Sequence, residues 1–372
     1  MKAQPAAFLR TTLPLGIDMV GEYDSGRYHS IWLPDHMVSF WPDSIWTPEF
    51  TDLAKVSPSP HRHLDGMAVA AAAAVLTQNT PLATTVVDTV RRHPSLLAQS
   101  ALTISHLSKG RFILGLGSGE LENTVPYGFD FAKPVSRLEE SIKVIKLLWH
   151  SDGPVDFEGE FYHLEHARMD TELFDGKAPP IWLGAAGPRM LGITGREADG
   201  WWPAGSYTPE DYAAKLRTIL DAGDAAGRDM SHFTPAITQI CLIGEPDEID
   251  EMLRAPMVKS IILMLTAKDL AQFGYEHPMG PDWRGIMDFD PVKLSREAML
   301  KFCDEMNPQA IRDIFPVGTP REVATKLKGF IDAGCRVYKL MEYGGMGGMK
   351  FSATSAAKVR ETEDAIQRLV EG

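Results

Sequence analysis

Short apolar runs alternate with helical segments along almost the whole chain, and this alternation constrains the fold more than any other feature. The expected strands are short runs of β-branched and other apolar residues, at 30–33, 81–87, 112–116, 181–184, 200–203 and 336–341. The expected helices repeat apolar residues at helical spacing, at 65–76, 94–107, 135–149, 188–196, 209–226, 320–333 and within 356–370. Such alternation predicts a parallel sheet with helices outside it.

A closed barrel fits this pattern better than an open sheet. A (β/α)8 barrel needs roughly 250 residues, and the chain has 372. We assign the surplus to two insertions, at 39–64, which is rich in proline and tryptophan, and at 268–308, which is rich in turn residues. No internal repeat or charged linker divides the chain. We therefore predict one α/β domain over 1–372, a TIM barrel with insertions, and keep a doubly wound open sheet as the alternative.

Composition excludes several classes of partner. The formal net charge is −13 and no basic stripe is present, which argues against nucleic acid and anionic membranes. Three widely separated cysteines indicate reduced thiols and not a disulfide framework. The N-terminal residues lack the apolar core of a signal peptide, and the apolar run 67–76 is too short to span a bilayer. We expect a cytoplasmic protein with no membrane span.

Two expected strand ends carry groups suited to proton transfer, and barrel enzymes place function at the carboxyl ends of their strands. His36 follows Asp35 after the first strand, and histidine titrates near neutrality. The run 115–119, GLGSG, forms a glycine-rich turn that delivers Glu120 and Asn123. Such turns bring backbone N–H groups close to a ligand. A loop hydrogen bond for His36 and a solvated position for Glu120 are the alternatives.

Two further strand ends are weaker candidates. The run 84–88, TTVVD, ends the third expected strand, and taken alone it is better explained by buried strand residues than by a site. The run 184–189, GAAGPR, places small residues before a helix, where backbone N–H groups favour a phosphate. Close packing of strand and helix explains the same glycines. The placement of all four candidates on strand ends is what favours a common site.

Other patterns support no separate chemistry. The glycine turn is neither a Rossmann fingerprint nor a phosphate loop, and no G-x-S-x-G elbow is present. His61 and His63 lack a third ligand, so no metal site is predicted. His277 is expected to make a loop hydrogen bond. Trp41 and Trp46 are candidates for the wall of a substrate pocket, and packing within the insertion is the alternative.

Several of these segments resemble one known family. The matching pieces are PDH at 34–36, FILGLGSGELEN at 112–123, KPVSRLEESIKVIKLLW at 133–149 and IWLGAAGPRMLGITGREADGWWP at 181–203. Together they resemble the bacterial luciferase-like family, and within it the branch that uses the deazaflavin coenzyme F420, including its mycobacterial ketoreductases. The resemblance is specific over about 31–203 and looser in the last helix–strand–helix.

The resemblance implies a fold, a cofactor and roles for particular residues. It implies an insertion-bearing (β/α)8 barrel, a homodimer, and a non-proline cis peptide at Thr85-Val86. His36 and Glu120 would be the catalytic proton-handling pair, with Asp35 beside them. The implied cofactor contacts are Asp35, Thr85, Val86, Gly117, Ser118, Gly119, Glu120, Asn123, Gly184, Ala185, Ala186 and Gly187. Phe40 stands where the sugar-phosphate dehydrogenase branch has tryptophan, which disfavours glucose 6-phosphate as the substrate.

The function expected from these observations is an F420-dependent oxidoreductase. It would transfer a hydride between the deazaflavin and a small organic carbonyl or alcohol, in a partly hydrophobic pocket. One alternative is an FMN-dependent luciferase-like monooxygenase that consumes oxygen. The other is a non-catalytic protein that binds flavin or F420, in which His36 and Glu120 would be dispensable.

Overall fold

Eight parallel strand positions form a closed barrel in the computed structural model, which describes residues 3–203 and 208–371. The strands are β1 (Gln4–Pro5) with β2 (Ala7–Phe8), β3 (Ile31–Leu33), β4 (Leu82–Thr84) with β5 (Val87–Asp88), β6 (Phe112–Gly117), β9 (Ile181–Leu183), β10 (Gly200–Trp201), β11 (Thr234–Ile243) and β13 (Val337–Glu342). Since β1 pairs with β13 while β2 pairs with β3, and only Ala6 separates them, the segment 4–8 closes the ring. The predicted barrel is confirmed, and the open-sheet alternative is wrong.

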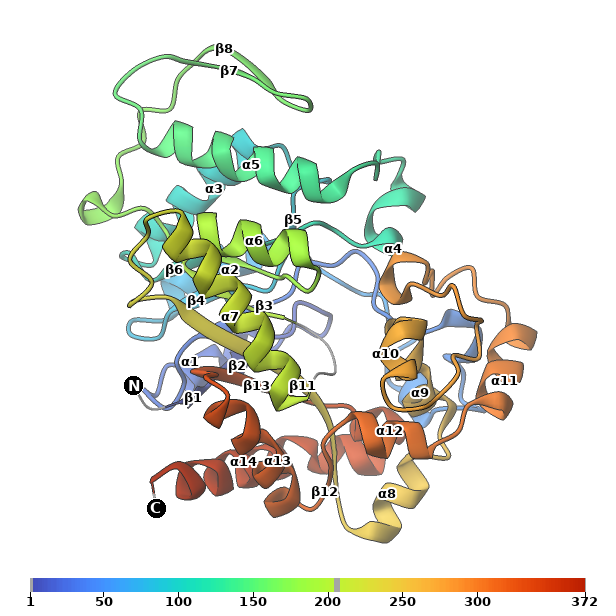
Figure 1. The fold of residues 1–372 in the computed structure, drawn as a ribbon. Coiled ribbons are helices and arrows are strands. Elements are labelled where there is room, and N and C mark those ends of the chain that lie inside the picture. The colour runs from blue at the N-terminus through green and yellow to red at the C-terminus, as the bar shows by residue number, and fades with distance from the viewer. Residues whose placement is uncertain (1–2, 204–207, 372) are drawn as a thin grey trace.

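Helices cover the outside of this barrel (Figure 1). They are α2 (Gly66–Leu76), α3 (Pro94–Leu107), α5 (Pro134–Trp149), α6 (Pro188–Glu197), α7 (Pro209–Ala225), α13 (Pro320–Asp332) and α14 (Met349–Glu371). Proline begins five of the seven, where its fixed φ suits the first helical position and its missing N–H costs nothing. The last helix begins at Met349, before the predicted region, and the strand predicted at 81–87 is interrupted between β4 and β5.

Side chains alternate between the barrel interior and the helical layer. Ala236 belongs to the small interior cluster that also holds three tryptophans, whereas Ile237, Cys241 and Ile243 pack outward against helices. This alternation is the period of two expected for a strand. The ten-residue strand β11 was not among the predicted elements, although its run TPAITQICLI is rich in β-branched residues.

A second apolar cluster lies to one side of the barrel and joins the two predicted insertions. The helical segments between β11 and β12 (Val317–Gly318) are α8 (Pro246–Met252), α9 (Pro256–Lys259), α10 (Ala267–Ala271), α11 (Arg296–Glu305) and α12 (Gln309–Ile314). They share this cluster with Ile45 from the first insertion, and Phe302 is among its buried members. The helical segment is longer than the predicted 268–308. The single-domain limits 1–372 stay a prediction.

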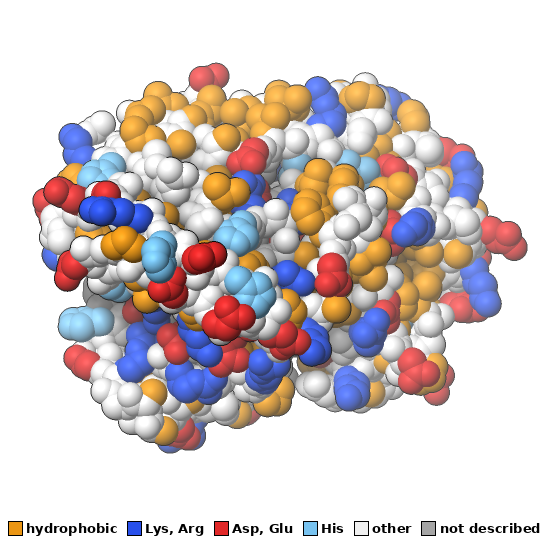
Figure 2. All heavy atoms as spheres, turned by 90° about the horizontal axis from the view of Figure 1, so that it is seen from above, with side chains coloured by type: hydrophobic (Ala, Val, Ile, Leu, Met, Phe, Trp, Pro, Cys, Tyr) orange, Lys and Arg blue, Asp and Glu red, His pale blue; other side chains and the backbone are white. Residues whose placement is uncertain are grey.

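The remaining elements are small. They are α1 (Val20–Tyr23), α4 (Leu121–Thr124) and the antiparallel hairpin β7 (Val155–Glu158) and β8 (His163–Ala167). Figure 2 shows one face of the molecule, on which acidic and basic side chains are interspersed. Within the described part of the chain, no helix combines the length and the apolar character needed to cross a membrane.

Candidate active site

The loops after β3 and β6 bring His36 and Glu120 together. His36 follows β3, and its Nδ1 lies 3.3 Å from Oε2 of Glu120, which follows the glycine turn after β6. Both side chains are partly exposed, at 18% and 27%. Two side chains from separate strand ends, predicted from the sequence alone, therefore form one pair at the carboxyl end of the barrel.

The glycine turn requires glycine because the neighbouring strand approaches it closely. A Cβ at Gly115 would lie 1.9 Å from the carbonyl oxygen of Thr84, and one at Gly117 would lie 2.6 Å from Val86 Cγ2. Gly119 has a φ of +91°, which other residues rarely adopt. The peptide between Thr85 and Val86 is cis, as the resemblance implied. The turn after β6 and the end of β4 are therefore packed together at the barrel mouth.

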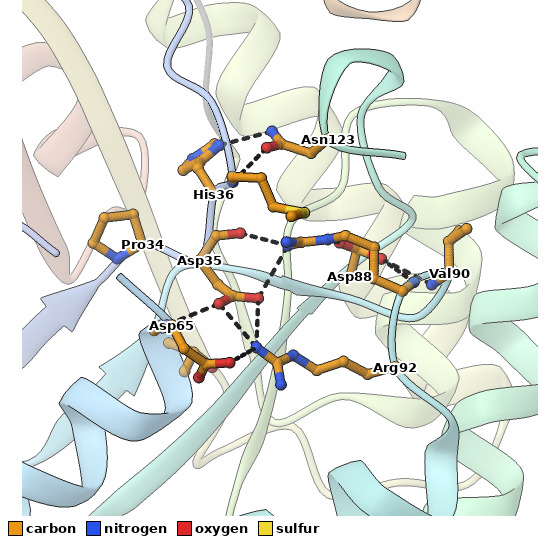
Figure 3. Close-up of polar contacts among 12 residues, drawn as sticks. Pro34, Asp35, His36, Asp65, Asp88, Val90, Arg92 and Asn123 are labelled. Atoms are coloured by element: carbon orange, nitrogen blue, oxygen red, sulfur yellow. Dashed lines mark hydrogen bonds and ion pairs between the residues drawn. The ribbon is translucent and has the colours of Figure 1, made fainter. Parts of the chain in front are cut away.

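Asn123 ties the two loops to each other. Its Oδ1 accepts hydrogen bonds from the backbone N–H groups of Met37 (2.6 Å) and Val38 (3.0 Å), directly after His36. Its Nδ2 lies 3.0 Å from His36 Nδ1 and 3.0 Å from Glu120 Oε2. Figure 3 shows Asn123 facing His36 across the site. Asn123 is almost fully buried, so one amide fixes the backbone after β3 and donates to the Glu120 carboxylate.

Electrostatics favour the charged forms of the pair. Burial by itself would lower the pKa of His36, but the Glu120 carboxylate and its hydrogen bond raise that pKa above the ordinary value. Burial likewise opposes ionisation of Glu120, but His36 and hydrogen bonds hold the pKa of Glu120 below its ordinary value. The site therefore holds an imidazolium–carboxylate pair near neutral pH.

A second glutamate, Glu122, lies beneath this pair and was missed by the sequence analysis. Its side chain is 1% exposed, and its Oε1 lies 3.0 Å from Asn123 Nδ2. Its Oε2 is buried with no hydrogen-bond partner. Burial, followed by the charge of Glu120, raises the pKa of Glu122 to about 10. Burial and the neighbouring carboxylate therefore favour the neutral form of Glu122.

Asp35 points away from the pair and holds its loop in place. Its buried carboxylate accepts hydrogen bonds from Arg91 (3.0 Å), Arg92 (3.1 Å) and the backbone N–H of Gly66 (2.9 Å). Figure 3 shows this carboxylate in contact with Arg92. The same arginines pair with Asp88 and Asp65, so the network joins β3, β5 and the start of α2. The sequence analysis named Asp35 but missed both arginines.

Three buried side-chain donors associated with the barrel interior have no hydrogen-bond partner. Buried donors without partners are Thr85 Oγ1, Trp202 Nε1 and Thr238 Oγ1. Trp202 belongs to the interior cluster, and Thr238 alternates with the interior residue Ala236. Buried polar groups are normally satisfied, so these donors indicate a ligand with acceptor atoms.

The other expected cofactor residues lie on the same side of the barrel. Ser118 and Gly119 continue the turn to Glu120. A Cβ at Gly184 would lie 3.5 Å from Cγ1 of Val86. The loop Ala185, Ala186 and Gly187 leads into α6, whose first turn has no side-chain cap. Arg189, on that helix, is already bound to Ser136 and Glu139. The free N–H groups of α6 are therefore the available anion-binding feature of this loop.

The remaining named residues mostly make structural contacts. Trp41 packs on Tyr343 with ring centroids 4.7 Å apart, and Trp46 donates to the carbonyl oxygen of Ser57 (2.8 Å). Both belong to the rim of the second apolar cluster. Nε2 of His277 lies 3.1 Å from the carbonyl oxygen of Ile262, which is the expected loop hydrogen bond. His63 is close to the site, with its ring centroid 5.6 Å from that of His36.

A closed parallel barrel with an acid–base pair at its carboxyl end defines an enzyme of the (β/α)8-barrel class. The chain belongs to the luciferase-like monooxygenase family, whose model matches residues 17–336.

Individual relatives agree with this assignment. The chain is 34% identical over 337 residues to a phthiodiolone/phenolphthiodiolone dimycocerosates ketoreductase of Mycobacterium tuberculosis, covering 90% of this chain and 88% of the relative. It is 30% identical over 308 residues to an F420-dependent glucose-6-phosphate dehydrogenase of Kineococcus radiotolerans, covering 78% and 80%. Among solved structures, an F420-dependent secondary alcohol dehydrogenase with an F420–acetone adduct superposes with a TM-score of 0.71 at 21% identity, covering 98% and 99%.

Proposed function

We propose that this protein is an F420-dependent oxidoreductase that interconverts a small organic carbonyl compound and its alcohol. The observation that carries the proposal is the His36–Glu120 pair, because it places a charged proton donor at the mouth of the barrel. Relatives whose names state a ketoreductase and F420-dependent dehydrogenases support the class of reaction and the cofactor.

The residues present fit this cofactor. The partnerless donors Thr85, Trp202 and Thr238 would meet the carbonyl-bearing edge of a deazaflavin. The uncapped start of α6 would accept an anionic tail. When bound, F420 supplies the hydride chemistry. The protein supplies position, exclusion of water and the proton.

The proton step follows from the geometry of His36. Glu120 engages Nδ1, so Nε2 is the ring atom that delivers a proton. In carbonyl reduction the substrate carbon gains a hydride and its oxygen becomes an alkoxide, which takes the proton from Nε2. Glu120 stabilises the imidazolium before transfer and keeps the ring in one orientation. In alcohol oxidation, neutral His36 accepts the hydroxyl proton.

A cofactor titration tests the proposal directly. A ligand at 100-fold above its dissociation constant stabilises a protein by about 2.7 kcal/mol, so F420 should raise the melting temperature. His36→Ala should retain F420 binding while turnover falls roughly 10²–10⁴-fold, since general acid catalysis contributes about that factor. Absence of F420 binding would overturn the proposal. F420 binding without turnover in the wild type would instead favour a non-catalytic binding protein.

The family model favours a second candidate, an FMN-dependent monooxygenase. The two candidates differ in what they consume. The monooxygenase would bind FMN more tightly than F420 and take up oxygen with turnover. The oxidoreductase proposed here would turn over anaerobically. An oxygen electrode and paired titrations with FMN and F420 separate the two.

A further inference from the structure

The buried carboxyl of Glu122 has no part in the proton step described above, although it lies next to the groups that perform it. It is on α4, two residues after Glu120, and is 1% exposed. Charged glutamates are almost never fully buried without a partner of opposite charge. The burial of this side chain therefore requires an explanation of its own.

Geometry places the two carboxyl groups together. Asn123 Nδ2 lies 3.0 Å from both Glu120 Oε2 and Glu122 Oε1. A ring nitrogen of His36 and one carboxyl oxygen each of Glu120 and Glu122 all lie within 4.8 Å of one another. His36 supplies one positive charge, and Glu120 is its partner. A second carboxylate in this cluster would face a like charge in a buried position, which is strongly unfavourable.

We propose that Glu122 holds a proton at neutral pH and donates it in a hydrogen bond to Glu120, which keeps Glu120 ionised and directed at His36. The side chains of Glu120 and Glu122 lie within hydrogen-bonding reach of each other, and this contact is where the proton is shared. Glu122 is thus a positioning residue that acts through Glu120. Its effect on turnover rests on the proposed function, whereas its protonation is a property of the protein alone.

The surrounding charges agree with this assignment. The charged groups that act on Glu122 are Glu120 and Asp290, and both are acidic. Around His36, Glu120 and Asp35 favour the charged imidazole, while Arg91 disfavours it. His63, mainly through burial, has its pKa lowered to about 3 and is neutral. One positive and one negative side chain therefore remain among His36, Glu120 and Glu122.

Stability measurements without cofactor test the proton on Glu122. The folded pKa of Glu122 is raised, so its favourable contribution is complete below about 4.5 and is lost as pH rises toward about 10. Glu122→Gln removes this loss. Between pH 5.5 and 8.5, the unfolding equilibrium constant of the wild type should therefore rise about tenfold per pH unit relative to that of the variant. Urea unfolding measures both constants. Glu276→Gln, at an exposed position, is the control and should show no such trend.

A difference between Glu122→Gln and wild type that is constant over this pH range would overturn the proposal, because Glu122 would then be ionised in the folded protein. The result does not depend on F420, on a substrate or on turnover.

An NMR titration of the His36 ring tests the positioning role. Gln can donate an N–H to Glu120 in place of the acid proton, so Glu122→Gln should leave the pKa of His36 unchanged. Glu122→Leu removes the donor and should lower that pKa by roughly one unit. If Glu122 were an anion, both variants would lower it equally, and the proposal would fail.

Turnover separates this inference from the proposed function. With F420 and a ketone, Glu122→Gln should keep the wild-type pH profile, and Glu122→Leu should shift its basic limb to lower pH. An unaltered basic limb in Glu122→Leu would contradict the positioning role. If wild type shows no F420 turnover, the proposed function fails, while the unfolding and NMR results still decide the state of Glu122.

Discussion

Asn123 is the residue on which the site depends most, although it carries no charge. It accepts from two backbone N–H groups after β3 and donates toward the acidic groups after β6. His36 and Glu120 were predictable because each follows an apolar run at an expected strand end. Glu122 was not, because GELENT has the composition of a solvated loop, and only the short turn of α4 buries this glutamate.

The reduction of a carbonyl substrate should weaken at high pH. The pKa of His36 is raised by Glu120 against the opposing effect of burial, and the protonated form is the proton donor. The rate should therefore be highest below this raised pKa and fall as pH rises through it, above 6.5. The stability from the His36–Glu120 pair should be lost over the same range. A kcat profile from pH 5 to 9 measures the first effect.

His36→Gln is the control for that profile. It should lower kcat roughly 10²–10⁴-fold and remove the basic limb. If the basic limb of the wild-type kcat profile persists in His36→Gln, a group other than His36 is responsible for it.

At the scale of elements, most helices around the barrel were predicted closely, whereas the helices α8–α12, the start of α14 and the strand connections were not. The helix 94–107 has its predicted ends because Pro94 and the apolar spacing mark them. The interruption between β4 and β5 follows from the cis peptide at Thr85-Val86 and from the close contact of Gly115 with Thr84. Neither feature is evident from the local sequence. The pairing of Arg91 and Arg92 with Asp35 joins segments more than fifty residues apart, which no local pattern records.

Asp35→Asn should destabilise the fold by about 3 kcal/mol. The change leaves Arg91 and Arg92 facing a neutral group in a mostly buried position, and removing one partner of such a network is costly. Chemical denaturation measures the loss. Asp65→Asn is the matched control, because its side chain is 50% exposed and asparagine can still cap α2. Equal effects of the two changes would contradict the structural role of Asp35.

Two glycine substitutions should separate folding from binding. Gly117→Ala places a methyl 2.6 Å from Val86 Cγ2 and should cost about 1–3 kcal/mol through overpacking. Gly187→Ala meets nothing within 4 Å at a φ of −80°, so stability should change by less than about 0.5 kcal/mol. If Gly187 contacts the cofactor, F420 affinity should nevertheless fall. Unchanged affinity would remove Gly187 from the cofactor contacts.

At the scale of the whole molecule, the barrel was predictable and its lateral helical cluster was not. Strand–helix alternation fixes the barrel, but the packing of Ile45 against helices from beyond β11 depends on long-range contacts. The cytoplasmic location and the homodimer stay predictions from the sequence.

Sedimentation equilibrium should give twice the 41.1 kDa chain mass at micromolar concentration. Three exposed apolar side chains on the barrel helices, Val75, Leu76 and Leu96, are the first residues to test. Charged replacements there should yield a monomer if these helices pair, with Val292→Glu, on a distant exposed loop, as the control. A monomeric wild type would contradict the prediction.

Closure of the ring by residues 4–8 has a consequence for biosynthesis. These residues are synthesised long before their partner β13, which follows them far along the chain. The nascent chain therefore carries an open, apolar sheet edge until β13 has been made. During this interval the exposed sheet edge is available to a chaperone. Slower elongation before residue 337 should lengthen the interval.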